Sequence, residues 1–133
     1  MSTATGAKYV FGKTVGLGFD EAVKRVTEEL AKEGFGVLTE IDVAATLKKK
    51  LGLDMPPYRI LGACNPQFAR QAIELEPQIG ALLPCNVVVR EEGKKTRVDI
   101  MDPLAVLQLV ERPEIEGIAA EVRKRLERVL ASL

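Results

Sequence analysis

The chain has 133 residues, of which 47% are hydrophobic and 29% charged, and these values predict one globular domain over residues 1–133. Its 19 basic residues balance its 19 acidic ones, which argues against a DNA or RNA partner, because binding to phosphate backbones requires excess positive charge. No apolar run approaches the length of a membrane span. The first residues lack the pattern of a signal peptide, so we expect a cytoplasmic protein without a membrane partner.

The sequence contains no histidine. This excludes Ser-His-Asp and Cys-His catalysis, histidine metal ligands and imidazole acid-base chemistry near neutral pH. Any reaction at this protein would have to use thiols, carboxylates, lysines, tyrosines or backbone groups. The sequence leaves open whether the protein is an enzyme, and it specifies no cofactor.

The N-terminal half alternates strand and helix patterns. Weak alternation predicts a strand over residues 8–15, and a stripe of apolar residues at helical spacing predicts a helix over 19–33. The stripe consists of Phe19, Ala22, Val23, Val26 and Leu30. A strand that is apolar on both faces apart from Thr39 and Glu40 is expected over 35–41, followed by a short helix over 43–51 that Gly52 ends.

The C-terminal half adds three strands and three helices. Strands are expected over 58–63, from Cys85 through Val89, and over 96–101, with an unusually apolar loop at 77–84 between the first two. Helices are expected over 66–76, 103–109 and 114–133. The last has one apolar face made of Ile115, Ile118, Ala119, Val122, Leu126, Val129 and Leu130. This order predicts a two-layer α/β fold with helices packed on a mixed sheet that contains parallel and antiparallel neighbours.

Three polar residues stand directly before predicted helices. Asp42, Asn65 and Asp102 are all of the types preferred at helix N-caps, and a proline follows each of the last two. Capping would use the Asp42 carboxylate fully, which favours a structural role for it.

Two Cys-Asn pairs are the feature that composition does not explain. The chain has two cysteines and two asparagines, and they form Cys64-Asn65 and Cys85-Asn86, each at the junction of an apolar strand and a turn. Cys64 precedes a helix N-terminus, where partial positive charge can lower a thiol pKa. Asp102 ends another strand before a helix and is the carboxylate expected nearby. We therefore predict a ligand or thiol site formed by Cys64, Asn65, Cys85, Asn86 and Asp102.

The distance between the cysteines decides among the alternatives. A simple parallel crossover would leave them at opposite ends of the sheet, about 20 Å apart. If the loop after Pro77 climbs back first, the strand from Cys85 starts beside Cys64. The two thiols could then form a reversible disulfide, share a soft metal ion or flank a ligand. Both cysteines could equally be core residues, and zinc is disfavoured because there is no CxxC spacing and no histidine.

Several segments together resemble the family called domain of unknown function 302. They run from Gly34 to Val37, Glu40 to Val43, Lys50 to Gly52, Tyr58 to Pro66, Leu82 to Val87, and over Asp102-Pro103. The resemblance implies a fold of the TATA-binding-protein-like class and a homodimer, and makes Cys64 and Cys85 family-type positions. It implies no activity, cofactor or substrate.

Two functions from different classes remain. The first is a small cytoplasmic homodimer with a small-ligand or thiol site at Cys64-Asn65-Pro66. The alternative is a non-catalytic dimerisation or interaction domain whose cysteines are structural. The apolar loop at residues 79–83 offers a surface that a symmetric dimer could cover.

Overall fold

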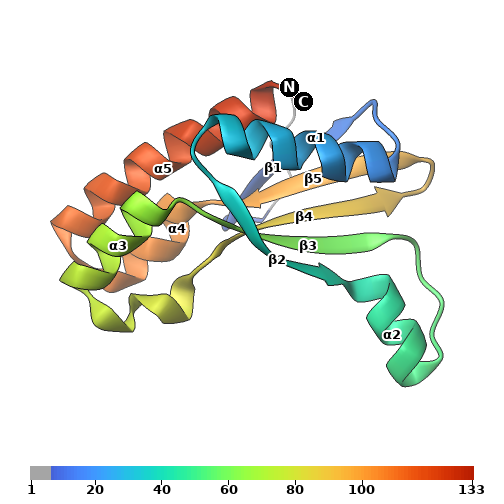
Figure 1. Ribbon diagram of the computed structural model, residues 1–133, viewed down its shortest axis with the longest axis horizontal. Coiled ribbons are helices and arrows are strands. Elements are labelled where there is room, and N and C mark those ends of the chain that lie inside the picture. The colour runs from blue at the N-terminus through green and yellow to red at the C-terminus, as the bar shows by residue number, and fades with distance from the viewer. Residues whose placement is uncertain (1–6) are drawn as a thin grey trace.

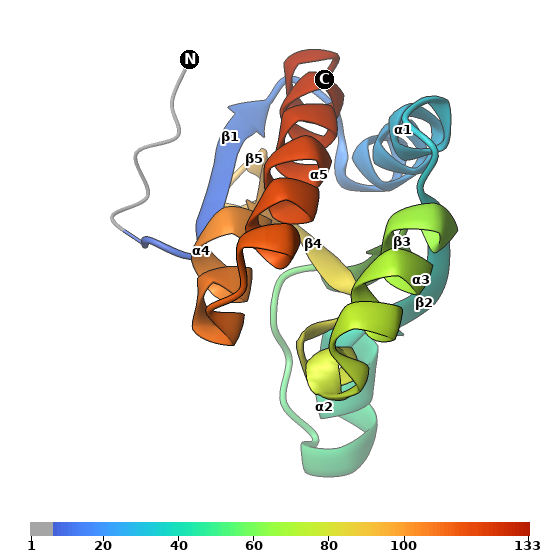
Figure 2. The same cartoon turned by 90° about the vertical axis from the view of Figure 1, so that its left-hand side faces the viewer.

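The computed structural model describes residues 7–133, which form one five-stranded sheet with helices on one face (Figure 1 and Figure 2). The strand order is β1-β5-β4-β3-β2. The strands are β1 (Val10–Val15), β2 (Gly36–Asp42), β3 (Tyr58–Cys64), β4 (Cys85–Glu92) and β5 (Lys95–Met101). The helices are α1 (Phe19–Lys32), α2 (Val43–Leu51), α3 (Pro66–Leu75), α4 (Pro103–Leu107) and α5 (Pro113–Ala131), with 3₁₀ turns η1 (Pro77–Leu82) and η2 (Gln108–Val110).

The two-layer α/β class is confirmed, but the expected parallel neighbours are not found. All four pairings between strands are antiparallel. The reason lies in two helical connections, each of which joins neighbouring strands at one end of the sheet without crossing it. The chain leaves β2 and enters β3 at the same end of the sheet, where Asp42 faces Arg59, and α2 projects away there (Figure 1). Likewise, α3 and η1 join β3 to β4 at the other end.

The main hydrophobic core lies between the sheet and helices α1 and α5. Its sheet side includes five fully buried residues: Leu61, Val87, Val89, Val98 and Ile100. The predicted stripes supply the helix side, since Ala22, Val26 and Leu30 from α1 and Leu126 from α5 are also fully buried. The segment 35–41, apolar on both faces apart from Thr39 and Glu40, forms β2 at the edge of the sheet, where Leu38 is 67% exposed.

A second, smaller cluster lies beyond the end of the sheet. It comprises Ala72, Ile79, Leu107, Ile115 and Ala119. The segment predicted as a loop forms η1 and buries Ile79 to 2% exposure, with Leu82 and Leu83 packed against the same cluster. The proposal that a dimer covers residues 79–83 therefore loses its basis, since the fold itself uses these apolar side chains.

All three predicted N-caps are confirmed. Asp42, Asn65 and Asp102 each accept a hydrogen bond from a backbone N–H in the first turn of α2, α3 and α4. Gly52 ends α2 in the left-handed conformation, at φ 68°. The three caps set where the chain leaves β2, β3 and β5 and enters a helix.

Candidate ligand pocket

The end of β3 and the start of α3 build one side of a pocket. Asn65 is only 7% exposed, and its Oδ1 accepts a hydrogen bond of 3.3 Å from the Phe68 N–H. Pro66 occupies the first turn of α3, where the fixed φ of proline suits a helix and no N–H is lost. The Cys64-Asn65-Pro66 sequence therefore converts a strand into a helix within one residue.

The start of β4 builds the adjacent side. Ala63 and Cys85 are paired residues of β3 and β4, and Cys64 is the next residue along β3. The chain thus takes the second of the two expected routes, and the two cysteines are neighbours. Leu83 and Pro84 lead into β4 through a cis peptide bond.

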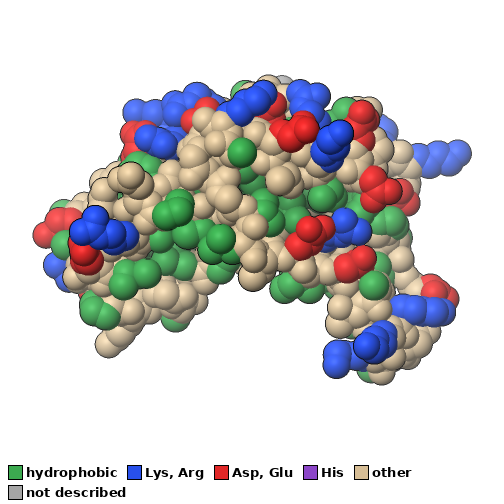
Figure 3. Space-filling model, viewed as in Figure 1, with side chains coloured by type: hydrophobic (Ala, Val, Ile, Leu, Met, Phe, Trp, Pro, Cys, Tyr) green, Lys and Arg blue, Asp and Glu red, His purple; other side chains and the backbone are tan. Residues whose placement is uncertain are grey.

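Between these segments and the helices lies an apolar pocket with a volume of roughly 40 Å³. Hydrophobic side chains gather on the surface around α3 and η1 at this end of the molecule (Figure 3). Its lining comes from the strand ends, from α3, and from α4 and α5: Phe35, Ala63, Cys64, Asn65, Phe68, Ala69, Ala72, Leu83, Pro84, Cys85, Pro103, Leu107, Ile118 and Val122. A space of this size admits water or a short alkyl group, and a larger ligand would have to displace a lining side chain.

The two thiols differ in burial and are both hard to ionise. Burial raises the pKa of Cys64, which is half-buried. Burial, together with the nearby Cys64 thiol, raises the pKa of Cys85 to about 11. The expectation that the α3 N-terminus lowers the Cys64 pKa is therefore wrong, because desolvation is the main influence there and the Phe68 N–H is already bonded to Asn65.

The other two predicted site residues lie outside the pocket lining. Asn86 is exposed, and strand alternation places it on the opposite sheet face from Cys85. Asp102 is 9% exposed and caps α4, since its Oδ1 accepts from the Leu104 and Ala105 N–H groups. Its Oδ2 accepts a hydrogen bond of 3.0 Å from Arg123 Nη1. Asp102 therefore fixes the start of α4, whose first residue, Pro103, lines the pocket.

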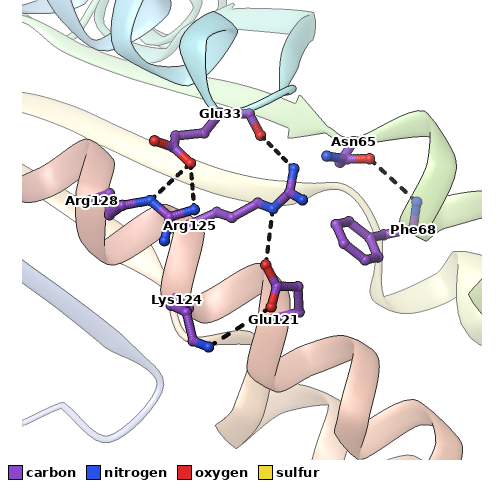
Figure 4. Close-up of polar contacts among 7 residues, drawn as sticks. All are labelled: Glu33, Asn65, Phe68, Glu121, Lys124, Arg125 and Arg128. Atoms are coloured by element: carbon purple, nitrogen blue, oxygen red, sulfur yellow. Dashed lines mark hydrogen bonds and ion pairs between the residues drawn. The ribbon is translucent and has the colours of Figure 1, made fainter.

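A group of charged residues beside the pocket was missed by sequence reasoning (Figure 4). The Arg125 guanidinium stacks on the Phe68 ring, 5.0 Å from the ring centroid. Arg125 donates to the Glu33 carbonyl (3.2 Å) and to Glu121 Oε2 (3.2 Å). The spacing of Glu121 and Arg125, one helical turn apart, could have predicted their ion pair from the sequence. The contact with Glu33 could not be predicted in this way, because Glu33 lies far away in the sequence.

The described residues contain no candidate metal site. Within residues 7–133, no three Cys, Asp or Glu side chains come together as a candidate metal site. In the same part of the chain, no helix is long and apolar enough to span a membrane.

Fold and pocket define a class: a two-layer α/β protein with an antiparallel five-stranded sheet and an apolar pocket at one sheet end. The chain belongs to the family described as domain of unknown function DUF302, whose model matches residues 11–133. A solved structure is similar over nearly the whole chain, namely that of an uncharacterized conserved DUF302 protein from Bacillus stearothermophilus. The identity is 35% and the TM-score 0.87, with 94% of this chain and 98% of that chain covered. The comparison with curated proteins gave no match.

Proposed function

We propose that this protein binds a small, largely apolar ligand in the pocket at Cys64-Asn65-Pro66. The observation that carries the proposal is the pocket itself, which lies between two hydrophobic clusters and which both cysteines line. An unfilled apolar space of roughly 40 Å³ costs the fold about 1 kcal/mol. A ligand that fills it would recover that free energy.

The thiols serve in this proposal as soft, polarisable wall groups. A nucleophilic cysteine needs a depressed pKa, whereas burial raises the pKa of both Cys64 and Cys85. Two free thiols also suit a reducing compartment such as the cytoplasm. Ligand binding by protonated thiols is therefore favoured over thiol catalysis.

The test is a titration of the ¹⁵N-labelled protein with 1-butanol, followed by NMR. We expect shifts confined to the amides of α3 and of residues 83–85. The variant Ala69→Leu narrows the pocket and should abolish these shifts, whereas Ala120→Leu on the exposed side of α5 should leave them unchanged. Shifts that persist in Ala69→Leu, or that never appear in the wild type, would count against the pocket as a binding site.

A second readout uses methyl methanethiosulfonate, which adds one methylthio group to a thiol. We expect Cys64 to react before Cys85, because Cys64 is only half-buried. Both should react more slowly than in denatured protein, since their pKa values are raised. The single-thiol variants Cys64→Ser and Cys85→Ser assign the two rates, and native-state reaction as fast as in the denatured state would contradict this description.

We also propose that two copies pair through the sheet face opposite α1 and α5. Ile41, Ile60 and Val88 form a row of cross-strand neighbours on three adjacent strands. Ile41 is 48% exposed, and helices α1 and α5 lie on the other side of the sheet (Figure 2). A second copy of this chain could cover this row, which also supports the alternative function as a dimerisation domain.

Light scattering at micromolar concentration tests the dimer. The wild type should give twice the chain mass and Ile60→Asp the mass of a single chain, while Leu109→Asp, at a site 74% exposed on η2, should remain dimeric. A wild-type monomer would overturn this proposal.

A further inference from the structure

We infer that α3 is a movable cover over the pocket, that Arg112 latches its C-terminal end, and that release of this latch admits ligands larger than the closed space. The inference rests on the proposed function, and it adds how a ligand enters. A chain longer than a short alkyl group does not fit a space of roughly 40 Å³, so one wall of the pocket has to move.

Helix α3 is the wall that is least fixed by apolar burial. Ala72 is its one buried residue, whereas α4 has two and α5 has six. Two of its three pocket-lining residues, Ala69 and Ala72, have small side chains, so the helix spans the space without filling it. An opening of α3 would therefore expose little apolar surface.

The chain is anchored on both sides of α3. Asn65, which is 7% exposed, follows β3 directly and is the N-cap of α3. Ile79, which is 2% exposed, belongs to the smaller hydrophobic cluster. At the N-terminal end of the helix, the Arg125 guanidinium also stacks on the Phe68 ring. Opening is therefore confined to the segment between residues 65 and 79, and its C-terminal part is the freer one.

Arg112 closes this freer end. It is the residue directly before α5, and α3 lies beside α5 (Figure 2). Its Nη1 donates to the Leu75 carbonyl oxygen and to Glu76 Oε1, the latter at 3.3 Å. Carbonyl groups in the last turn of a helix lack intrahelical partners, so the guanidinium takes a place that water can also take. The side chains of Arg112 and Glu76 are 37% and 31% exposed, and this polar latch can therefore open without disrupting the apolar core.

The two states of the latch differ in the ligands that they bind. With the latch closed, the pocket holds only a short alkyl chain. With the latch open, the α3 wall moves away from the strand ends and from α5, and a longer chain fits. A ligand that binds only the open state has an affinity reduced by the fraction of molecules that are open. Weakening the latch should therefore tighten the binding of a long ligand, whereas general damage to the pocket would weaken it.

The first experiment measures amide hydrogen exchange of the ligand-free protein by NMR. In the wild type, amides of residues 70–75 should exchange faster than those in the middle of α5. Arg112→Met keeps an apolar stem but removes both contacts, and should speed exchange in α3 about tenfold while α5 changes by less than about twofold. The control Arg70→Met removes an equally positive, 78% exposed side chain of α3 itself, and should change exchange by less than about twofold.

The second experiment compares 1-octanol with 1-butanol as probes by NMR titration. Arg112→Met should bind 1-octanol about tenfold more tightly than the wild type, in proportion to its larger open fraction. Its affinity for 1-butanol should stay within about twofold, because this probe fits the closed pocket. Glu76→Gln removes the ion pair but leaves the Leu75 contact, and should tighten 1-octanol binding by only about twofold to threefold.

The outcomes separate the two proposals. If α3 exchanges as slowly as α5, or if Arg112→Met speeds both helices equally, the latch is overturned while the pocket stands. Weaker binding of 1-octanol by Arg112→Met than by the wild type would also overturn it. If neither alcohol shifts the amides around the pocket, the proposed function fails, and the inference about ligand entry fails with it.

Discussion

The two hydrophobic clusters of this protein are built differently. The main core is closed by long elements, with β-branched and leucine side chains from β3, β4 and β5 at 0% exposure. The smaller cluster is assembled by three short elements, α3, α4 and η1, against the first turns of α5, and two of its five buried members are alanines. The pocket lies where the two meet. The sheet therefore supports a densely packed core, whereas the cluster beyond its end leaves an unfilled apolar space.

The largest expected effect on the free energy of unfolding comes from replacing a buried leucine by alanine, and it should differ between the two clusters. Leu61→Ala should lower the free energy of unfolding by about 3–5 kcal/mol, because long elements around a fully buried site cannot close a cavity. Leu107→Ala should cost about 2–3 kcal/mol, because the short α4 can relax into the pocket. Urea denaturation measures both, with the exposed Leu109→Ala as a control expected within about 0.5 kcal/mol of the wild type. Equal costs for Leu61 and Leu107 would remove the distinction between the clusters.

The next largest effect is a loss of stability at high pH from Cys85. Its pKa is about 11 in the folded protein against 9.0 for the ordinary thiol, so the folded state holds its proton more tightly than the unfolded state. The resulting stabilisation is complete below about pH 9 and is lost as the pH rises to about 11, and it amounts to about 2–3 kcal/mol.

Other groups titrate in the same range, so the measurement is the difference between the wild type and Cys85→Ala. Urea denaturation in the presence of a reductant should give a stability advantage for the wild type that shrinks between pH 9 and 11. Parallel pH curves for the two proteins would show that Cys85 titrates normally.

The smallest expected difference, about 1–2 kcal/mol, is between the costs of removing the helix caps at the two ends of the sheet. Asp102→Ala removes the cap of α4 and leaves Arg123 without this partner, and should cost about 2–3 kcal/mol. Asp42→Ala, at the exposed start of α2, should cost about 1 kcal/mol. Asp102→Asn keeps the cap but removes the charge, so its cost measures the Arg123 contribution alone. If Asp42→Ala proved the more damaging, α2 would be more important to the fold than its projection from the sheet suggests (Figure 1).

The sequence by itself determined the local structure of this protein. Helical periodicity predicted which faces of α1 and α5 are buried, and the residue types at positions 42, 65 and 102 predicted where three helices begin. These features depend on neighbouring residues only, so a single sequence contains them. The Cys-Asn pairs also directed attention to the sheet end where Cys64, Asn65 and Cys85 line the pocket.

Tertiary structure alone decided the rest. Strand direction depends on whether a connecting helix passes over the sheet or projects beyond its end, which periodicity does not encode, so the expected parallel pairs were wrong. The fold buries Ile79 inside the monomer instead of at a dimer surface, and it buries both thiols far enough to raise their pKa values. Phe68 and Arg125 lie far apart in the sequence, and only the packing of α5 beside α3 stacks the Arg125 guanidinium on the Phe68 ring.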